Sequence, residues 1–207
     1  MKTLPTQERA LKKRQALINA AINEFSSIGF EAATAKSVAA EARVATGTFY
    51  QYFENKNDIL RVIAESRFDG LNEKVKLLEL KVVEEGEFDG PNVELQFLET
   101  LTFVHQFHAR NPELHQVLEQ RRALDSKLRV IMDEGEHVLR MRVLAFVNTF
   151  NIANSELVAA NLFAMAEGLV HRLVFHSVEH EPEKSLKIGA QMLASYFISN
   201  HIIDKDA

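Results

Sequence analysis

Apolar residues recur at three- and four-residue spacings along almost the whole chain of 207 residues, and alternating β-branched residues are nearly absent. This periodicity is typical of amphipathic helices and not of strands. The four prolines, Pro5, Pro91, Pro112 and Pro182, all lie where the periodicity lapses, as expected of helix starts and connections. The sequence therefore predicts an all-α fold of about nine helices.

Start and stop signals divide this pattern into helices. Gly29 is a natural C-terminal stop for the first helix, and Thr34 caps the second. Asn55 caps a long fourth helix, with Asp58 in the capping-box position. The expected helices span about 6–27, 34–42, 45–53, 55–83, 92–110, 112–119, 121–150, 155–180 and 183–203. The inner face of the first is expected to consist of Leu17, Ile18, Ala21, Ile22, Phe25 and Ile28.

The charge of the chain is acidic overall but unevenly distributed. A formal net charge of −5 argues against a protein that coats nucleic acid or an anionic membrane. Residues 1–61, however, carry nine Lys and Arg against six Asp and Glu, whereas residues 62–207 carry fifteen against twenty-three. Such a split favours a nucleic-acid face on the N-terminal part, although a mildly basic end is also common in other proteins.

Two absences exclude further classes of protein. There is no cysteine, which excludes disulfide scaffolds, thiol catalysis and Cys-ligated metal sites. The N-terminus has no apolar leader, and no charge-free stretch reaches membrane-spanning length. We therefore expect a soluble cytoplasmic protein that does not associate with a membrane.

The clearest motif lies between Thr34 and Phe53, and it reads TAKSVAAEARVATGTFYQYF. It predicts two short helices joined by a tight turn, with the small residue Ala39 where they cross and Val44 in the angle after the turn. This arrangement is a helix-turn-helix. The buried face of its second helix is expected to consist of Ala45, Phe49 and Phe53, which recur every four residues.

The same periodicity leaves an unusual outer face on the second short helix. Its residues are Thr46, Gly47, Thr48, Tyr50 and Gln51. Hydroxyls and amides hydrogen-bond base edges and phosphates, and glycine allows close approach of the backbone, so this face suits the major groove of double-stranded DNA. A face needed only for solubility would carry Lys and Glu.

Other side chains around the motif fit contacts with phosphate. Thr34 and Lys36 lie at the start of the first short helix, where free N–H groups attract anions. Tyr52 offers a phenolic donor, and Lys56 adds a cation at the start of the long helix. The basic run at residues 12–14 could follow the flanking DNA backbone or simply form a solvated helix face.

Residues 9–61 resemble the DNA-binding domain of the TetR family of bacterial transcriptional regulators. The matching residues are Gly29, Phe30, Thr34, Val38, Ala39, Ala42, Val44 to Tyr50, Phe53, Lys56 and Leu60. The resemblance implies a cytoplasmic homodimer that binds a palindromic operator, usually represses, and releases DNA when a small molecule enters the C-terminal domain. It also implies that Lys36, Thr46, Gly47 and Thr48 contact or lie against bases, and that Thr34, Tyr50, Tyr52 and Lys56 contact phosphate.

Three positions depart from the pattern of the family. Arg43 stands where the family usually has a turn glycine, and an arginine there costs roughly 1 kcal/mol if its φ is positive. Tyr52 occupies a position that is often His, and Ala33 one that is often Thr. These departures affect the expected contacts in detail.

The sequence predicts a DNA-binding domain over residues 1–54 and a helical effector-binding and dimerisation domain over residues 55–207, linked by the helix 55–84. The last two helices are apolar around much of their circumference, which favours either a homodimeric four-helix bundle or ordinary core packing. A small, largely apolar effector is expected. Its candidate pocket residues, which could equally be packed core, are Phe103, Phe107, Met141, Phe163, Glu167 and His171.

Enzyme classes find little support in the sequence. Glu134 and His137 form a Glu-x-x-His pattern known from di-iron bundles, but such a site needs two copies and only one is present. His105 and His108 could place two imidazoles on one helix face, with no third ligand evident. We therefore expect no enzyme activity, no metal and no cofactor. A DNA-binding dimer without a small-molecule effector is the alternative to a ligand-responsive regulator.

Overall fold

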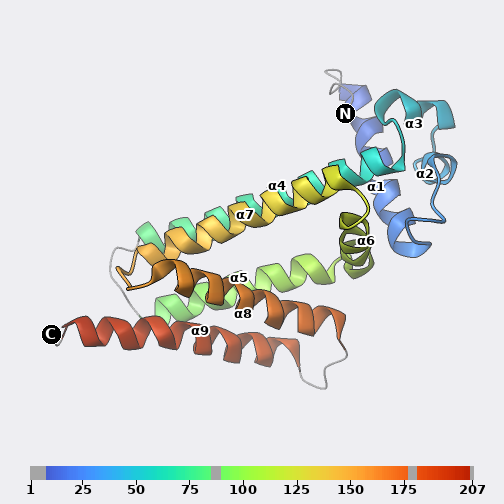
Figure 1. Cartoon of the computed structure of the whole chain (residues 1–207). Coiled ribbons are helices and arrows are strands. Elements are labelled where there is room, and N and C mark those ends of the chain that lie inside the picture. Colours follow the sequence, from blue (N-terminus) through green and yellow to red (C-terminus); the bar gives the residue numbers. More distant parts are fainter. Residues whose placement is uncertain (1–7, 85–89, 177–180, 206–207) are drawn as a thin grey trace. The chain divides into compact units, whose positions relative to one another are not determined.

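The computed structural model describes residues 8–84, 90–176 and 181–205. Within these ranges the chain forms nine helices and no strand, which confirms the predicted all-α fold (Figure 1). Pro5 and most of the expected loop at 84–91 lie outside the described residues. The helices are α1 (Glu8–Ser27), α2 (Ala35–Glu41), α3 (Thr46–Tyr52), α4 (Lys56–Glu84), α5 (Gly90–Ala109), α6 (Pro112–Arg122), α7 (Ser126–Asn148), α8 (Ser155–Phe175) and α9 (Pro182–Lys205).

The chain forms two compact units, each described by itself. The head unit consists of Met1–Phe68 and Asn111–Glu134, and the C-terminal unit consists of Asp69–Arg110 and Gly135–Ala207. The head unit therefore contains α1 to α3, the first part of α4, all of α6 and the first part of α7. The sequence predicts a division into two functional domains at residue 55. The head unit extends beyond this point to Phe68, and the distant segment Asn111–Glu134 completes it.

The centre of the head unit is an apolar core between α1, α2 and α3, with α6 packed against α1 (Figure 1). Phe49 and Phe53 are buried with ring centroids 5.7 Å apart, as predicted for the inner face of α3. Ala45 is exposed, so its predicted burial is wrong. The reason is that Ala45 is the extended N-cap of α3 (ψ 146°) and lies outside the helical periodicity.

The end of α1 corrects a second predicted core position. Ile28 is 50% exposed, although the periodicity of α1 predicts that it points inward. Gly29 ends the helix with a φ of 81°, a left-handed conformation that glycine adopts at no steric cost. The turn sends Phe30 into the core in place of Ile28, and the Phe30 ring lies 5.1 Å from that of Phe25.

Side-chain caps start two of the head helices where the sequence predicts them. The Ser37 amide donates to the Thr34 hydroxyl oxygen and the Thr34 amide donates to the Ser37 hydroxyl oxygen, both over 3.0 Å. Asn55 caps α4 by accepting a hydrogen bond from the Asp58 amide (3.0 Å). Asp58 is buried, and its carboxylate accepts from the Glu54 amide (3.1 Å), one residue before the expected capping-box partner.

An ion pair between a half-buried arginine and a buried aspartate joins α4 to the start of α7 within the head unit. Arg61 donates from Nε to both carboxylate oxygens of Asp125 (3.2 and 3.0 Å), and its Nη2 lies 2.8 Å from Oδ2. The Asp125 side chain is 7% exposed. Asp125 directly precedes α7 and also accepts hydrogen bonds from the amides of Lys127 and Leu128, both 3.1 Å. One carboxylate therefore caps a helix and holds an arginine.

The surroundings of Asp125 act on its pKa in opposite directions. Burial by itself raises the pKa, because it disfavours the charged form. The hydrogen bonds from Arg61 and from the amides of Leu128 and Lys127, together with the charge of Arg61, outweigh burial. The pKa of Asp125 is therefore held below its usual value, and the carboxylate is charged at neutral pH.

In the C-terminal unit, α5, α8 and α9 lie side by side, with α9 antiparallel to the other two (Figure 1). Gly189 allows α9 to approach α8 closely, because a Cβ at this position would collide with the side chain of Leu169. The buried core consists of Val93, Phe97, Leu101, Val147, Ala159, Leu162, Val170, Leu186, Ala190, Leu193, Ala194 and Phe197.

One helix among the described residues, α8, is long and apolar enough to cross a membrane by length and composition alone. Only 17% of its most apolar window is buried within the chain. A helix that covers an apolar interface between proteins has the same composition, so this property by itself does not indicate a membrane.

We expect the substitution Asp125→Asn to lower the free energy of unfolding at pH 7 by about 2–3 kcal/mol, because the half-buried Arg61 is left without a counter-charge. Since the pKa of Asp125 is lower in the folded than in the unfolded state, its contribution is complete above an unfolded pKa of about 3.9 and is lost as the pH falls through the folded value. Urea unfolding of wild type and variant between pH 7 and pH 2.5 measures both effects.

The matched control is Asp133→Asn, because Asp133 pairs with Arg122 on the surface, with the two side chains 51% and 26% exposed. Its loss should cost less than about 1 kcal/mol. If the difference in unfolding free energy between the wild type and Asp125→Asn stays constant down to pH 2.5, the role of the Asp125 charge is contradicted.

Candidate DNA-binding site

The turn between α2 and α3 is held by two backbone hydrogen bonds. The Val44 amide donates to the Ala39 carbonyl (2.9 Å), and the Arg43 amide donates to the Ala40 carbonyl (3.0 Å). This pair of bonds is the Schellman arrangement, which ends a helix with a residue in the left-handed region. Arg43 occupies that position with a φ of 55°, so the strain expected for an arginine there is present.

One face of α3 is buried and the other is open. Phe49 is fully buried, whereas Tyr50 is 51% exposed. A Cβ at Gly47 would meet no atom of the described residues within 4 Å, so packing among these residues does not require this glycine. Of the six predicted DNA-contacting residues of α3, the exposed ones are Thr46, Gly47, Tyr50 and Gln51, and the half-buried ones are Thr48 and Tyr52.

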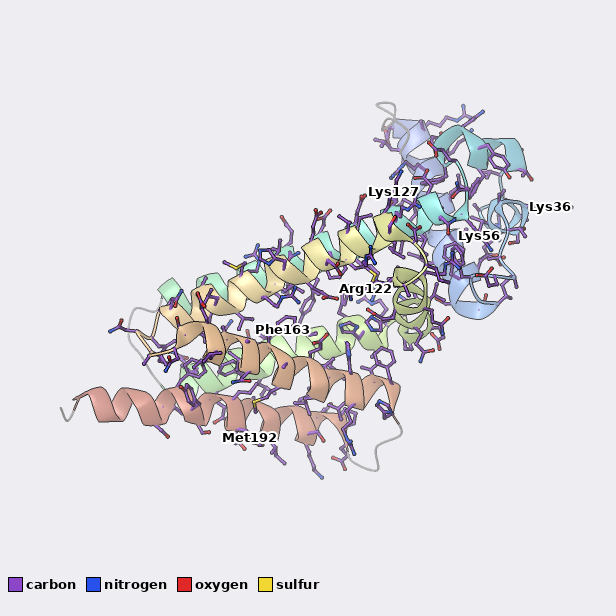
Figure 2. The ribbon with its side chains drawn as sticks, in the orientation of Figure 1. Lys36, Lys56, Arg122, Lys127, Phe163 and Met192 are labelled. Carbon is purple, nitrogen blue, oxygen red and sulfur yellow. The ribbon has the colours of Figure 1, made fainter. Side chains whose placement is uncertain are left out.

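The two predicted contact residues near the start of α2 are both exposed. Thr34 uses its hydroxyl oxygen to accept the Ser37 amide, which leaves the hydroxyl hydrogen available as a donor. Lys36 extends from α2 without a hydrogen bond or ion pair to the residues that the structure describes (Figure 2). The Lys36 ammonium is therefore available to an external anion.

Lys56, at the start of α4, is engaged inside the head unit (Figure 2). Its ammonium donates to the Phe30 carbonyl (2.8 Å) and to the Glu31 carbonyl (3.2 Å). The Glu31 carboxylate lies 3.7 Å away, and the Phe30 ring centroid lies 4.5 Å from Nζ. The side chain is 28% exposed. Lys56 therefore stabilises the turn that follows α1, and only part of its ammonium can face a phosphate.

Arg121, at the end of α6, contacts the same turn and is not among the residues that the sequence predicts for this site. Its Nη1 donates to the Glu31 carboxylate over 2.9 Å, and its guanidinium carbon lies 4.6 Å from the centre of the Phe30 ring. Two cations thus stack on one phenylalanine. Arg121 is 90 residues from Glu31 in sequence, and neither helical periodicity nor a motif indicates such a pair.

The candidate effector residues lie in the C-terminal unit. Phe103 and Phe107 contact each other along α5, with ring centroids 6.2 Å apart. The ring of His171 lies 5.1 Å from that of His108 and 5.4 Å from that of Phe175. By exposure, Phe103, Phe107, Phe163 and His171 are half-buried, whereas Met141 and Glu167 are exposed.

This geometry defines a class of protein. Two short helices cross through a Schellman turn, rest on a third helix and expose a face of small polar side chains on α3. That arrangement is a DNA-binding helix-turn-helix.

Comparison with known proteins shows what the helix-turn-helix part of the chain is similar to. Residues 17–63 match the family model described as bacterial regulatory proteins, tetR family. The HTH-type transcriptional regulator HbdR of Aromatoleum sp. (strain CIB) is 36% identical over 64 residues, which are 31% of this chain and 28% of HbdR. Over residues 17–63 the head unit is similar to the helix-turn-helix domain of the tetR family of bacterial regulatory proteins.

Solved structures share the fold of the whole chain. A chain from Mesorhizobium loti, assigned to the TetR-family transcriptional regulators, superposes with a TM-score of 0.79 at 14% identity and covers 93% of this chain and 98% of its own length. The regulator FadR of Bacillus subtilis, in complex with stearoyl-CoA, superposes with a TM-score of 0.69 at 17% identity, over 87% of this chain and 97% of its own. At these identities the likeness concerns the fold.

Proposed function

We propose that the protein is a ligand-responsive repressor that binds a palindromic operator as a homodimer. In this proposal α3 of each subunit lies in a major groove, and the two copies of α3 meet half-sites about 34–36 Å apart, one turn of DNA. The observation that carries the proposal is the open face of α3, on which hydroxyl, amide and glycine positions lie together without a charged residue.

Gly47 supports a close approach of DNA to α3. A glycine inside a helix costs roughly 1 kcal/mol relative to alanine, and no atom of the described residues lies within 4 Å of the position that its Cβ would occupy. A base or phosphate against the backbone would account for the glycine. The proposed base contacts are Lys36, Thr46, Gly47, Thr48 and Gln51, and the proposed phosphate contacts are Thr34, Tyr50, Tyr52 and Lys56.

Exposed apolar side chains on the last two helices support a homodimer. On α9, Ile188, Met192 and Tyr196 follow one another at four-residue spacing and are 57%, 60% and 43% exposed. On α8, Leu157 and Met165 are 66% and 53% exposed. Single exposed apolar residues are common, but a stripe on adjacent helices is typical of an interface. Pairing α8 and α9 across a two-fold axis would cover this stripe.

Half-buried aromatic side chains in the C-terminal unit support a small, largely apolar effector. Phe103, Phe107, Phe163 and His171 provide the apolar surface, with Met141 and Glu167 as exposed candidates. The FadR fold, which is shared by this chain, is known with stearoyl-CoA bound. To reverse a strong preference for the DNA-binding form, an effector must bind the other form about 10⁴-fold more tightly, or about 5.5 kcal/mol.

The proposal places the protein in the cytoplasm as a DNA-binding regulator and not as an enzyme. The family and fold are those of transcriptional regulators. The alternative is a helix-turn-helix dimer without a small-molecule effector, which would act constitutively or under a protein partner.

Thr48→Ala and Tyr50→Phe are expected to affect DNA binding in different ways. Loss of the Thr48 hydroxyl should change the preferred base at one position of each half-site. Loss of the Tyr50 hydroxyl should weaken binding to all sequences by about 5- to 30-fold, because a phosphate contact carries no sequence information. In vitro selection of binding sites, followed by affinity measurements, separates the two effects. An unchanged selection profile for Thr48→Ala would remove it as a base contact.

Met192→Glu is expected to convert the dimer into monomers, because each interface would then bury two like charges. Met141→Glu is the matched control, since Met141 is 49% exposed on α7, outside the proposed interface. Sedimentation velocity at micromolar concentration measures the oligomeric state. A wild-type monomer, or a dimeric Met192→Glu variant, would rule out the α8–α9 interface.

Stearoyl-CoA is the first probe for the effector site. Addition of stearoyl-CoA is expected to weaken operator binding by the wild type. Phe163→Ala removes apolar contact area, so this variant should need about tenfold more stearoyl-CoA for the same release of operator. Fluorescence anisotropy with labelled operator measures both, and mass spectrometry of the purified protein detects any other molecule that it retains. If stearoyl-CoA has no effect and no small molecule is retained, the effector-free alternative is favoured.

A further inference from the structure

Arg43 is the unusual residue of the helix-turn-helix backbone. Among the described residues other than glycine, those with positive φ are Arg43, Asn151 and Asn154. Asparagine enters the left-handed region more readily than most residues, because its short side chain can hydrogen-bond locally. Arginine has no such compensation. The turn between α2 and α3 therefore holds a residue that its backbone conformation disfavours.

The Schellman turn itself does not require an arginine. Its two hydrogen bonds, from the amides of Arg43 and Val44 to the carbonyls of Ala40 and Ala39, involve backbone atoms and would form equally well with glycine at position 43. Glycine would also remove the steric penalty of the left-handed conformation. The backbone thus favours glycine, and any reason for arginine must lie in its side chain.

Nothing in the described part of the chain uses that side chain. Arg43 is exposed, and its guanidinium makes no hydrogen bond, ion pair or ring contact with the residues that the structure describes. Two other arginines of the head unit are engaged: Arg61 with Asp125, and Arg121 with Glu31 and Phe30. The Arg43 guanidinium is therefore directed to solvent or to an external partner.

The position of Arg43 indicates what that partner is. Arg43 lies three residues before Thr46, the first residue of α3, in the segment that leads directly into the proposed base-contacting turn. When the start of α3 enters a major groove, the connection before it lies beside the sugar-phosphate backbone at the groove edge. A guanidinium there presents paired N–H donors that match phosphate oxygens.

We propose that Arg43 is a phosphate-binding residue of the DNA interface, and that this contact offsets the backbone strain of an arginine in the turn. The proposal rests on the proposed operator binding. Since phosphate carries no base identity, Arg43 contributes affinity and fixes the position of α3 on the duplex, and it does not select sequence.

The experiment compares Arg43→Gly, Arg43→Asn and Arg43→Lys in the full-length protein. Arg43→Gly removes the backbone strain, so a loss of DNA binding in this variant cannot be explained by a failure to fold. Its melting temperature should rise by about 2–4 °C. Its affinity for operator and for unrelated duplex DNA should nevertheless fall by a similar factor, about tenfold at low salt. The slope of log affinity against log salt should become shallower by about 0.9, the value for one phosphate.

Arg43→Asn and Arg43→Lys separate charge from conformation. Arg43→Asn tolerates the left-handed backbone without a cation and should bind DNA as weakly as Arg43→Gly. Arg43→Lys keeps the cation and should retain most of the salt slope, with a partial loss of affinity because the paired donors are gone. If the wild type binds operator and Arg43→Gly binds it with the same affinity and slope, the role of Arg43 is refuted. If the wild type shows no salt-dependent binding to operator or to any other DNA, operator binding itself is refuted.

Discussion

The head unit depends on the charge pair between Arg61 and Asp125. Arg61 lies in the second turn of α4, and Asp125 caps α7, so their hydrogen bonds attach a segment 64 residues downstream to the helix that follows the DNA-binding motif. Because the carboxylate is buried, removal of either partner leaves the other without its counter-charge and weakens this attachment, which the apolar core between Leu114, Leu118, Leu128 and the first helices also supports. The fold of a three-helix DNA-binding motif is thereby extended by α6 and the start of α7.

A second set of contacts brings α6 to the turn after α1. Arg121 holds the Glu31 carboxylate and stacks on Phe30, and Lys56 contacts both residues from the start of α4. Three residues beyond Glu31, Thr34 caps α2. Any displacement of α6 relative to α1 must therefore break these contacts or carry the turn with it. Within the head unit, the orientation of α2 is coupled to α6 by named polar contacts as well as by the apolar core.

Local signals in the sequence predicted most of the fold, and contacts between distant segments account for what they missed. Caps at Thr34 and Asn55, the stop at Gly29 and the four-residue repeat through Phe49 and Phe53 act over a few residues, and each is found in the structure. Periodicity failed at Ile28 and Ala45, which lie at helix boundaries where the helical period no longer applies. Arg61 with Asp125 and Arg121 with Glu31 are separated by 64 and 90 residues, and such pairs leave no periodic trace.

The structure also shows which positive charges are available to an external anion. The sequence has nine basic residues in positions 1–61, but Arg61 is neutralised by Asp125 and Lys56 is directed to backbone carbonyls. Lys36, on α2, and Arg43, in the turn before α3, have no partner among the described residues. Net charge counts all of these cations alike, whereas an ion pair inside the protein largely cancels its field outside. The electrostatic attraction of this head for DNA therefore depends on the cations that have no partner among the described residues, which include Arg9 and Lys13 on α1 as well as Lys36 and Arg43, and an acidic whole-chain charge is compatible with it.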